Sequence, residues 1–198
     1  MIRTVFFDIG NVLVNYSEKK LQSQLAAVLG MNENTMVLHQ GIRKLYETGK
    51  INTNELCHYL RIQEKKTTSD TEILEAFSDV FWPNSSIFPL IRSLSEQKKR
   101  LILLSNTSEA HHLFIEKKFP ILEWFDDMVL SYKIGFMKPD PEIFQAALAK
   151  AQCKAHECFY IDDVSEFIEA AQKYHIDAKQ YTDTNSLVEE FKKREVYI

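Results

Sequence analysis

Short apolar runs alternate with segments of helical periodicity along most of the chain. The first run, Thr4-Val5-Phe6-Phe7, is β-branched and aromatic, and it is followed at once by Asp8 and then by Gly10. It predicts a buried strand that ends at a carboxylate. Further strands are predicted at Leu101–Leu104, Met128–Leu130 and Cys158–Ile161, with helical segments between them and a short strand and a helix at the end. This alternation favours an α/β fold, a doubly wound parallel sheet with right-handed crossovers.

Residues 16–83 have a different pattern, with four helical segments and no convincing strand between them. In the first segment, Ser17 is the expected cap and Gly30 the expected end. The other three are predicted at Glu33–Thr48 closed by Gly49, at Asn54–Arg61 capped by Thr53, and at Thr71–Trp82 capped by Asp70. We therefore predict a small helical cap of residues 16–83 inserted into a core of residues 1–15 and 84–198. Hinges are expected near Asn15 and Asn84.

The composition is that of an ordinary soluble globular protein, with 45% hydrophobic and 26% charged residues among 198. A net charge of -4 gives no support for a nucleic-acid partner. The apolar run before Asp8 is too short for a signal peptide, and no stretch approaches the roughly 20 apolar residues of a membrane span. The three cysteines form no CxxC pair, which argues against a disulfide framework or a zinc site. We expect a cytoplasmic protein with no membrane partner.

Polar residues follow three of the predicted strands. Asp8 follows the first, Ser105-Asn106-Thr107 the second, and Asp162-Asp163 the strand at Cys158–Ile161. Because the carboxyl ends of parallel strands meet at one edge of a sheet, these residues are expected to share one cleft.

Lys138 precedes Pro139, and Pro141 suits the first turn of a helix, so the lysine is expected to be held rigidly at a helix start. Taken singly, each of these polar residues is more often a helix cap or a solvated side chain. Together, however, three carboxylates gathered at one edge would repel one another unless a cation lay between them. Mg²⁺ typically binds one or two carboxylates together with a substrate phosphate.

The ordered set Phe7-Asp8-Ile9-Gly10-Asn11-Val12, Leu104-Ser105-Asn106-Thr107, Lys138-Pro139-Asp140-Pro141 and Tyr160-Ile161-Asp162-Asp163 resembles the four motifs of the haloacid dehalogenase superfamily. The resemblance spans nearly the whole chain and includes a helical cap between the first and second motifs. It is greatest to small capped phosphatases acting on sugar phosphates and to the phosphatase domain of epoxide hydrolases. It implies a Rossmann-like core and a phosphorylated small molecule as substrate.

The resemblance also implies roles for individual residues. Asp8 would be the nucleophile and would form an aspartyl-phosphate. Mg²⁺ would be held by Asp8, by the backbone carbonyl of Gly10 and by Asp163, with Asp162 assisting. The remaining roles concern the phosphate, which Ser105, Asn106 and Lys138 would bind, with Lys138 also neutralising the charge of the nucleophile.

Two positions depart from the pattern. Gly10 stands where many members carry an aspartate that acts as general acid and base, a contribution worth roughly 10²–10⁴-fold. One hypothesis is a leaving group that needs little protonation, such as that of an anomeric sugar phosphate or an acyl phosphate. The other is a substitute proton donor, with Tyr16, Glu18, His39 and His58 as candidates. The second departure is Phe167, where related sequences often carry Asn or Asp.

Three other activities compete with a Mg²⁺-dependent phosphomonoesterase. A hydrolytic dehalogenase is disfavoured because its chemistry needs no metal, whereas the negative charge that Asp162-Asp163 adds indicates a bound metal ion. A phosphomutase is disfavoured because Gly10 removes the acid and base that a reversible transfer would use. The alternative from a different class is a non-catalytic protein that binds a phosphorylated metabolite, which Gly10 keeps open.

Overall fold

A computed structural model describes residues 1–33, 38–62 and 67–198. Its main sheet has five parallel strands in the order β5-β4-β1-β6-β7. The strands are β1 (Thr4–Phe7), β4 (Arg100–Ser105), β5 (Asp127–Leu130), β6 (Cys158–Asp162) and β7 (Asp177–Gln180). The predicted α/β class and all its sheet strands are confirmed, with ends shifted by one residue at most where bounds were given.

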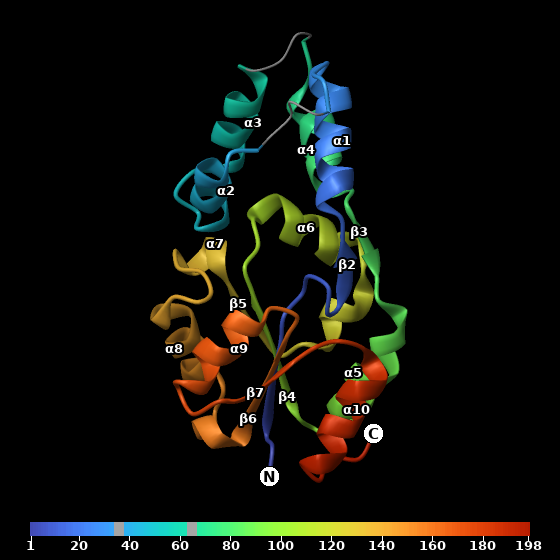
Figure 1. Cartoon of the computed structure of the whole chain (residues 1–198), viewed down its shortest axis with the longest axis vertical. Coiled ribbons are helices and arrows are strands. Elements are labelled where there is room, and N and C mark those ends of the chain that lie inside the picture. Colours follow the sequence, from blue (N-terminus) through green and yellow to red (C-terminus); the bar gives the residue numbers. More distant parts are fainter. Residues whose placement is uncertain (34–37, 63–66) are drawn as a thin grey trace.

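Strand β1 is the middle strand of the sheet, and its residues are buried on both faces. Val5 and Phe7 contribute to one hydrophobic cluster, and Phe6 contributes to the other. Helices α5 (Phe88–Glu96) and α10 (Thr184–Lys193) pack into the first cluster, while α8 (Pro141–Lys150) and α9 (Ser165–Gln172) pack into the second. The sheet is therefore covered on both sides, which explains why its inner strands β1, β4 and β6 are almost wholly buried (Figure 1).

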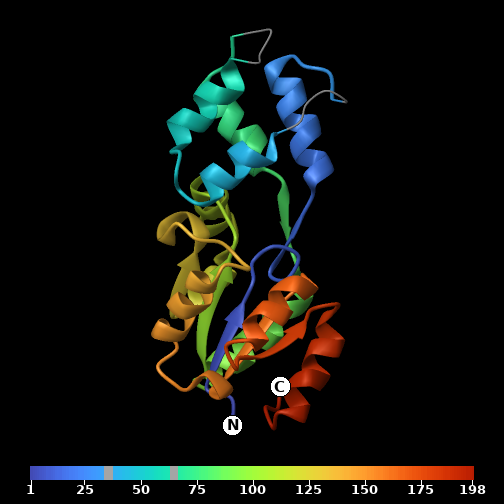
Figure 2. The same cartoon turned by 60° about the vertical axis from the view of Figure 1, so that its left-hand side comes forward.

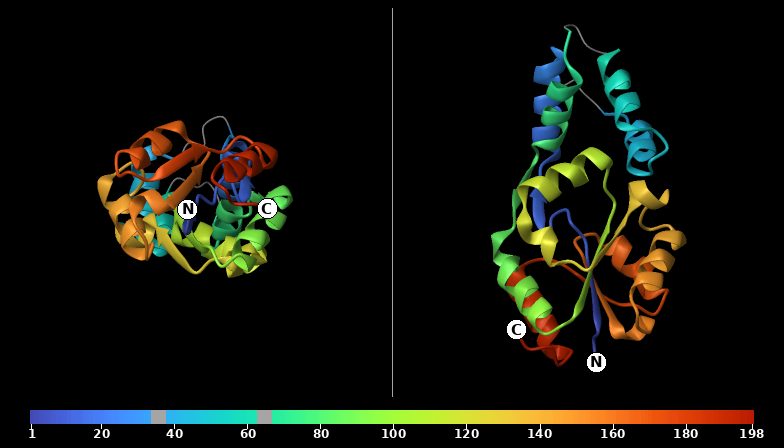
Figure 3. Two further views of the ribbon diagram at one scale, coloured as in Figure 1. Left: turned by 90° about the horizontal axis from the view of Figure 1, so that it is seen from below. Right: turned by 180° about the vertical axis from the view of Figure 1, so that it is seen from behind.

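The other elements connect or border these layers. Helices α6 (Glu109–Lys118) and α7 (Ser131–Ile134) follow β4 and β5, and three short 3₁₀ helices are η1 (Ser85–Ile87), η2 (Pro120–Trp124) and η3 (Ala155–Glu157). Both chain ends lie at the end of the molecule farthest from α1–α4 (Figures 2 and 3). Within the described ranges, no helix has the length and apolar character that crossing a membrane requires.

Four helices above the sheet build a hydrophobic cluster of their own. They are α1 (Glu18–Leu29), α2 (Gln40–Glu47), α3 (Thr53–Arg61) and α4 (Asp70–Ser78). Ser17 caps α1 and Gly30 closes it in the left-handed conformation, as predicted. The predicted second helix began at Glu33, but residues 34–37 lie outside the described ranges and α2 begins at Gln40.

Two predicted caps are wrong by one residue. Asn52 rather than Thr53 caps α3, and Ser69 rather than Asp70 caps α4. Both observed caps form a capping box in which a glutamate three residues later bonds back to the backbone N–H of the cap. That reciprocal bond selects the cap over its neighbour, which is also a suitable cap residue.

The prediction that residues 16–83 contain no strand is also wrong. The predicted helix Thr71–Trp82 ends at Ser78, and Phe81–Pro83 forms β3, which pairs antiparallel with β2 (Val14–Tyr16). Apolar residues at 80 and 81 continue the helical spacing, so the periodicity alone does not mark the break. The β2–β3 ribbon joins the four helices to the sheet (Figure 1).

Candidate active site

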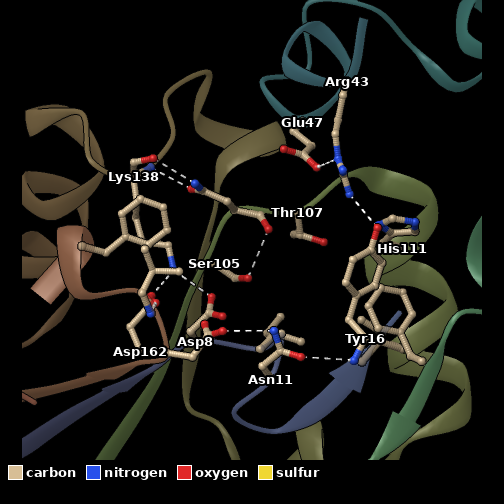
Figure 4. A pocket seen from close by; sticks show the side chains of 18 residues that line it. Asp8, Asn11, Tyr16, Arg43, Glu47, Ser105, Thr107, His111, Lys138 and Asp162 are labelled. Atoms are coloured by element: carbon tan, nitrogen blue, oxygen red, sulfur yellow. Dashed lines mark hydrogen bonds and ion pairs between the residues drawn. The ribbon is translucent and has the colours of Figure 1, made fainter. Parts of the chain in front are cut away.

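The polar residues predicted to share a cleft do meet at the carboxyl edge of the sheet. Asp8 follows β1 directly, and its backbone N–H donates to the Ile161 carbonyl of the neighbouring strand at 2.9 Å. The residue is 7% exposed, and its side chain faces a pocket (Figure 4). Burial raises the pKa of the Asp8 carboxyl to about 6, although the Lys138 ammonium acts in the opposite direction.

Lys138 is the central cation of the site. Its ammonium donates to Asp8 Oδ1 at 2.7 Å and to Asp162 Oδ2 at 2.5 Å. A third bond of 3.0 Å goes to the Leu104 carbonyl oxygen at the end of β4. Burial lowers the pKa of Lys138, but the two carboxylates outweigh that effect and hold it above its ordinary value. All three ammonium hydrogens therefore have partners, and the lysine stays charged between two carboxylates.

The backbone of Lys138 is held as firmly as its side chain. Asn106 accepts from the Lys138 backbone N–H at 2.7 Å and donates to its carbonyl oxygen at 2.9 Å. The peptide bond to Pro139 is cis. The rigid presentation of Lys138 expected from Pro139 thus involves a residue, Asn106, that we assigned to the phosphate. Both the oxygen and the nitrogen of the Asn106 side-chain amide are bonded to the Lys138 backbone.

Phe167 has a clear role in this arrangement. The Lys138 ammonium lies 5.1 Å from the centre of the Phe167 ring and 5.7 Å from that of Tyr160. Two aromatic faces therefore flank the cation, and one of them belongs to Phe167, the second departure from the motif pattern. Asp162 in turn is fully buried and accepts from the Tyr160 hydroxyl and from the Val164 backbone N–H.

Three carboxylates come close enough to share a cation. One oxygen each from Asp8, Asp162 and Asp163 lies within 4.8 Å of the others. Asp163 lies at the pocket rim and accepts from the Asn11 side chain at 3.0 Å. Gly10 also lines the pocket, and a Cβ built on it would lie 3.7 Å from Asp8 Oδ2, an ordinary contact. The group offers only oxygen ligands, the type that hard divalent cations prefer.

The end of β4 forms another wall of the pocket. Ser105, Asn106 and Thr107 all line it, and Ser105 is 2% exposed. The Thr107 backbone is fixed by Ser131, whose hydroxyl accepts from its N–H and donates to its carbonyl, both at 2.9 Å. The next residue, Ser108, caps α6, so the N-terminus of that helix begins directly beside the pocket.

The pocket encloses about 200 Å³ between the sheet edge and the helices above it. Tyr16, Arg43 and Glu47 line the side opposite Asp8 and Asp162 (Figure 4). Arg43 was not among the site residues predicted from the sequence, and Glu47 was predicted only as part of the helix closed by Gly49. In a sequence, two opposite charges four positions apart on a helix indicate no more than a surface ion pair.

The four candidate proton donors separate into two groups. Tyr16 lines the pocket and bonds to Glu18, whereas His39 and His58 are exposed and do not line it. Burial raises the pKa of Tyr16 above its ordinary range, which keeps the hydroxyl protonated. His111, which is followed by His112 on α6, also lines the pocket.

The buried ring of His111 stacks on Phe77 and donates from Nε2 to the Phe77 carbonyl oxygen at 3.0 Å. Burial lowers the pKa of His111 to about 4. The ring is therefore neutral at pH 7. Its neighbour His112 contacts Tyr132 instead, as expected for adjacent residues of a helix.

Similar proteins identify the family. A phosphatase for D-ribitol-5-phosphate from Bacteroides thetaiotaomicron is 28% identical over 179 residues, which cover 85% of this chain and 86% of that protein. A sesquiterpene phosphatase from Aspergillus oryzae is 26% identical over 92% of this chain and 91% of its own. A crystal structure of a Bacteroides thetaiotaomicron enzyme with magnesium and inorganic phosphate superposes with a TM-score of 0.84 at 27% identity, over 94% of this chain and 99% of that one. The model of the haloacid dehalogenase-like hydrolases matches residues 5–180 of 198, and the chain therefore belongs to that family.

Proposed function

We propose that this protein is a Mg²⁺-dependent phosphomonoesterase that acts on a small phosphorylated metabolite, with sugar phosphates as the leading substrate class. The observation that carries the proposal is a nearly buried carboxylate at the base of a small pocket, paired with a buried lysine and gathered with two further carboxylates. The relatives named for phosphatase activity support the same conclusion.

In this mechanism Asp8 attacks phosphorus and displaces the substrate alcohol, so that one P–O bond forms while another breaks. Water then attacks the aspartyl-phosphate and releases inorganic phosphate with the Asp8 carboxylate restored. Lys138 holds Asp8 at 2.7 Å and neutralises the charge of the nucleophile and the phosphate. The Ser105 hydroxyl at the end of β4 binds phosphate oxygens, while Asn106 acts by fixing Lys138.

The residues present fit a magnesium ion. Asp8, Asp163 and the backbone carbonyl of Gly10 would hold it, with Asp162 assisting through one of its oxygens. A bound cation would offset the repulsion among three carboxylates that have one lysine between them. The metal would supply positive charge for the phosphoryl oxygens.

We further propose that residues 16–83 form a cap and that residues 1–15 and 84–198 form the core to which it closes. Helix α2 contributes Arg43 and Glu47 to the pocket, although it belongs to the separate hydrophobic cluster of α1–α4. The antiparallel β2–β3 ribbon is the connection about which the cap would move. Closure would exclude bulk water during transfer.

Metal removal tests the proposal directly. Release of inorganic phosphate from acetyl phosphate should need Mg²⁺, stop with EDTA and return when Mg²⁺ is added in excess. Mg²⁺ should also raise the midpoint of thermal unfolding, since it binds the folded carboxylate cluster and not the unfolded chain. Phosphate release that persists undiminished in EDTA would contradict the proposal.

Gly10 leads to a second prediction, on the leaving group. Glucose 1-phosphate, whose anomeric oxygen leaves more easily, should turn over about 10²-fold faster than glucose 6-phosphate, the lower range for general acid catalysis. A Cβ at Gly10 would make only an ordinary contact, so Gly10→Asp should raise kcat for glucose 6-phosphate and narrow the ratio of the two rates. Gly10→Asn, of the same shape but unable to transfer the proton, should leave the ratio wide. Equal rates in the unaltered enzyme would contradict the leaving-group hypothesis.

A non-catalytic protein that binds a phosphorylated metabolite is the second candidate, and Gly10 is the feature that favours it. It predicts saturable binding of phosphate esters without release of phosphate from any of them. The acetyl phosphate assay separates the two candidates because this substrate needs no protonation by the enzyme.

A further inference from the structure

The side of the pocket that faces Asp8 carries a connected charged network, which we call the Arg43 cluster: Tyr16, Glu18, Arg43 and Glu47. Arg43 Nε donates to Glu47 Oε1 at 3.1 Å. Its Nη1 donates to Glu18 Oε2 at 2.8 Å, and its Nη2 donates to the Tyr16 hydroxyl at 2.7 Å. The cluster is thus built by residues of β2, α1 and α2, and three of its four members line the pocket.

The Arg43 cluster carries no net positive charge. One guanidinium lies between two carboxylates, so the fully ionised cluster carries an excess of one negative charge. Burial raises the pKa of Glu47, and if that residue is protonated the cluster is neutral. Tyr16 and His111 are both uncharged at pH 7, since burial moves their pKa values in the directions given above. In neither state would this side of the pocket attract a second anion.

Hydrogen-bonding capacity, in contrast, is available. A guanidinium has five N–H donors, and three of those of Arg43 have partners in the cluster. Glu47 uses Oε1 for Arg43, while its Oε2 has no bond among the described residues. Donors and an acceptor side by side match hydroxyl groups, which both accept and donate.

We propose that Arg43 and Glu47 determine specificity by selecting phosphate monoesters whose remaining part is uncharged and rich in hydroxyl groups, and by rejecting esters that carry a second anionic group. This inference rests on the proposed phosphatase function and assigns the substrate class for that site. In-line displacement places the leaving group opposite the nucleophile, and the Arg43 cluster lies on that side (Figure 4).

The size and walls of the pocket agree with a small hydroxylated group. A volume of about 200 Å³ is below the roughly 300–1,000 Å³ of pockets for drug-sized ligands. Phe81 and His111 provide part of the apolar wall and are packed edge to face at 5.0 Å. C–H groups of a short polyol or sugar can pack there while its hydroxyls reach the Arg43 cluster.

A matched pair of esters tests the charge rule. Glucose 1-phosphate and glucuronic acid 1-phosphate both release an anomeric oxygen, and they differ only at C6, where the first carries a CH2OH group and the second a carboxylate. The unaltered enzyme should favour the neutral ester in kcat/KM by about 10²-fold, because the additional carboxylate would be brought close to the carboxylates of the Arg43 cluster. Glu47→Gln removes a negative charge but keeps an acceptor for Arg43, and it should narrow that ratio by about tenfold. Arg43→Met should raise KM for glucose 1-phosphate more than it changes kcat.

Lys20→Met is the matched control, because Lys20 forms a 3.2 Å ion pair with Asp79 on the cap and does not line the pocket. It should leave every ratio unchanged. The inference would be overturned if the kcat/KM ratio of the two esters were near one in the unaltered enzyme, or if Glu47→Gln did not narrow that ratio. Hydrolysis of acetyl phosphate would uphold the phosphatase function even then. Calorimetry of both esters on the Asp8→Asn variant measures the same preference without turnover. If the variant bound the neutral ester more tightly, the inference would hold even if no ester were hydrolysed. Absence of hydrolysis would overturn only the proposed phosphatase function.

Discussion

Asp8→Asn is expected to lower kcat for phosphate release by about 10⁴-fold or more, the scale on which removal of a nucleophile acts. The amide has nearly the shape of the carboxylate but is a far poorer nucleophile toward phosphorus. The loss should be the same for acetyl phosphate and glucose 1-phosphate, since both need the attack that forms the aspartyl-phosphate. Stopped assays of inorganic phosphate measure it.

The stability of the Asp8→Asn variant should separate a lost nucleophile from a damaged fold. Burial of the charged Asp8 is unfavourable, which is why its pKa is raised to about 6, and Lys138 keeps Asp162 as a partner. We therefore expect thermal unfolding without metal at or above the midpoint of the unaltered protein, together with a smaller rise on adding Mg²⁺. Asp79→Asn, at the exposed ion pair with Lys20, is the control for the chemical change. A kcat within about tenfold of the original would show that Asp8 is not the nucleophile.

The strand-end residues were predictable because two local signals coincide at each of them. Apolar runs identify β1, β4 and β6, and a polar residue marks the end of each run. A general rule for parallel sheets then brings Asp8, Ser105 and Asp162 together with no further knowledge of the chain. Tertiary structure adds only the partners, such as the clamp that Asn106 forms on Lys138.

The side of the pocket formed by α2 was not predictable in the same way. Arg43 and Glu47 make an i,i+4 ion pair, and nothing in the sequence distinguishes it from the exposed pair Arg92–Glu96 on α5. What differs is the placement of α2 over the sheet edge, which depends on contacts between segments distant in sequence.

Strand β3 was missed for a related reason. Its pairing with β2 joins residues separated by more than sixty positions, whereas the apolar spacing up to Phe81 continues that of α4. Local periodicity therefore extended the helix, and the non-local pairing ended it. Hinges were predicted near Asn15 and Asn84 with no strand between them, whereas the structure has the two-stranded β2–β3 ribbon at this connection.

Lys138→Met is expected to lower both activity and stability by large amounts. The substitution leaves Asp8 and Asp162 buried without their shared cation, and breaking a buried ion pair on one side costs about 3–5 kcal/mol. At roughly 2–4 °C per kcal/mol for a chain of this size, the midpoint of thermal unfolding should fall by about 10 °C. Phosphate release should fall as well, because the nucleophile and the transferred phosphate lose the charge that balances them.

A second substitution shows whether the lost stability comes from charge. Adding Asp162→Asn to Lys138→Met removes one of the two unpaired carboxylates, so the double variant should recover part of the free energy of unfolding without recovering phosphate release. Lys192→Met, at the exposed pair with Glu189, controls for loss of a lysine and should cost less than about 1 kcal/mol. Urea unfolding in EDTA measures all three variants. If the double variant were less stable than Lys138→Met, Lys138 would stabilise the site through packing against Phe167 and Tyr160 and not through the carboxylates that it joins.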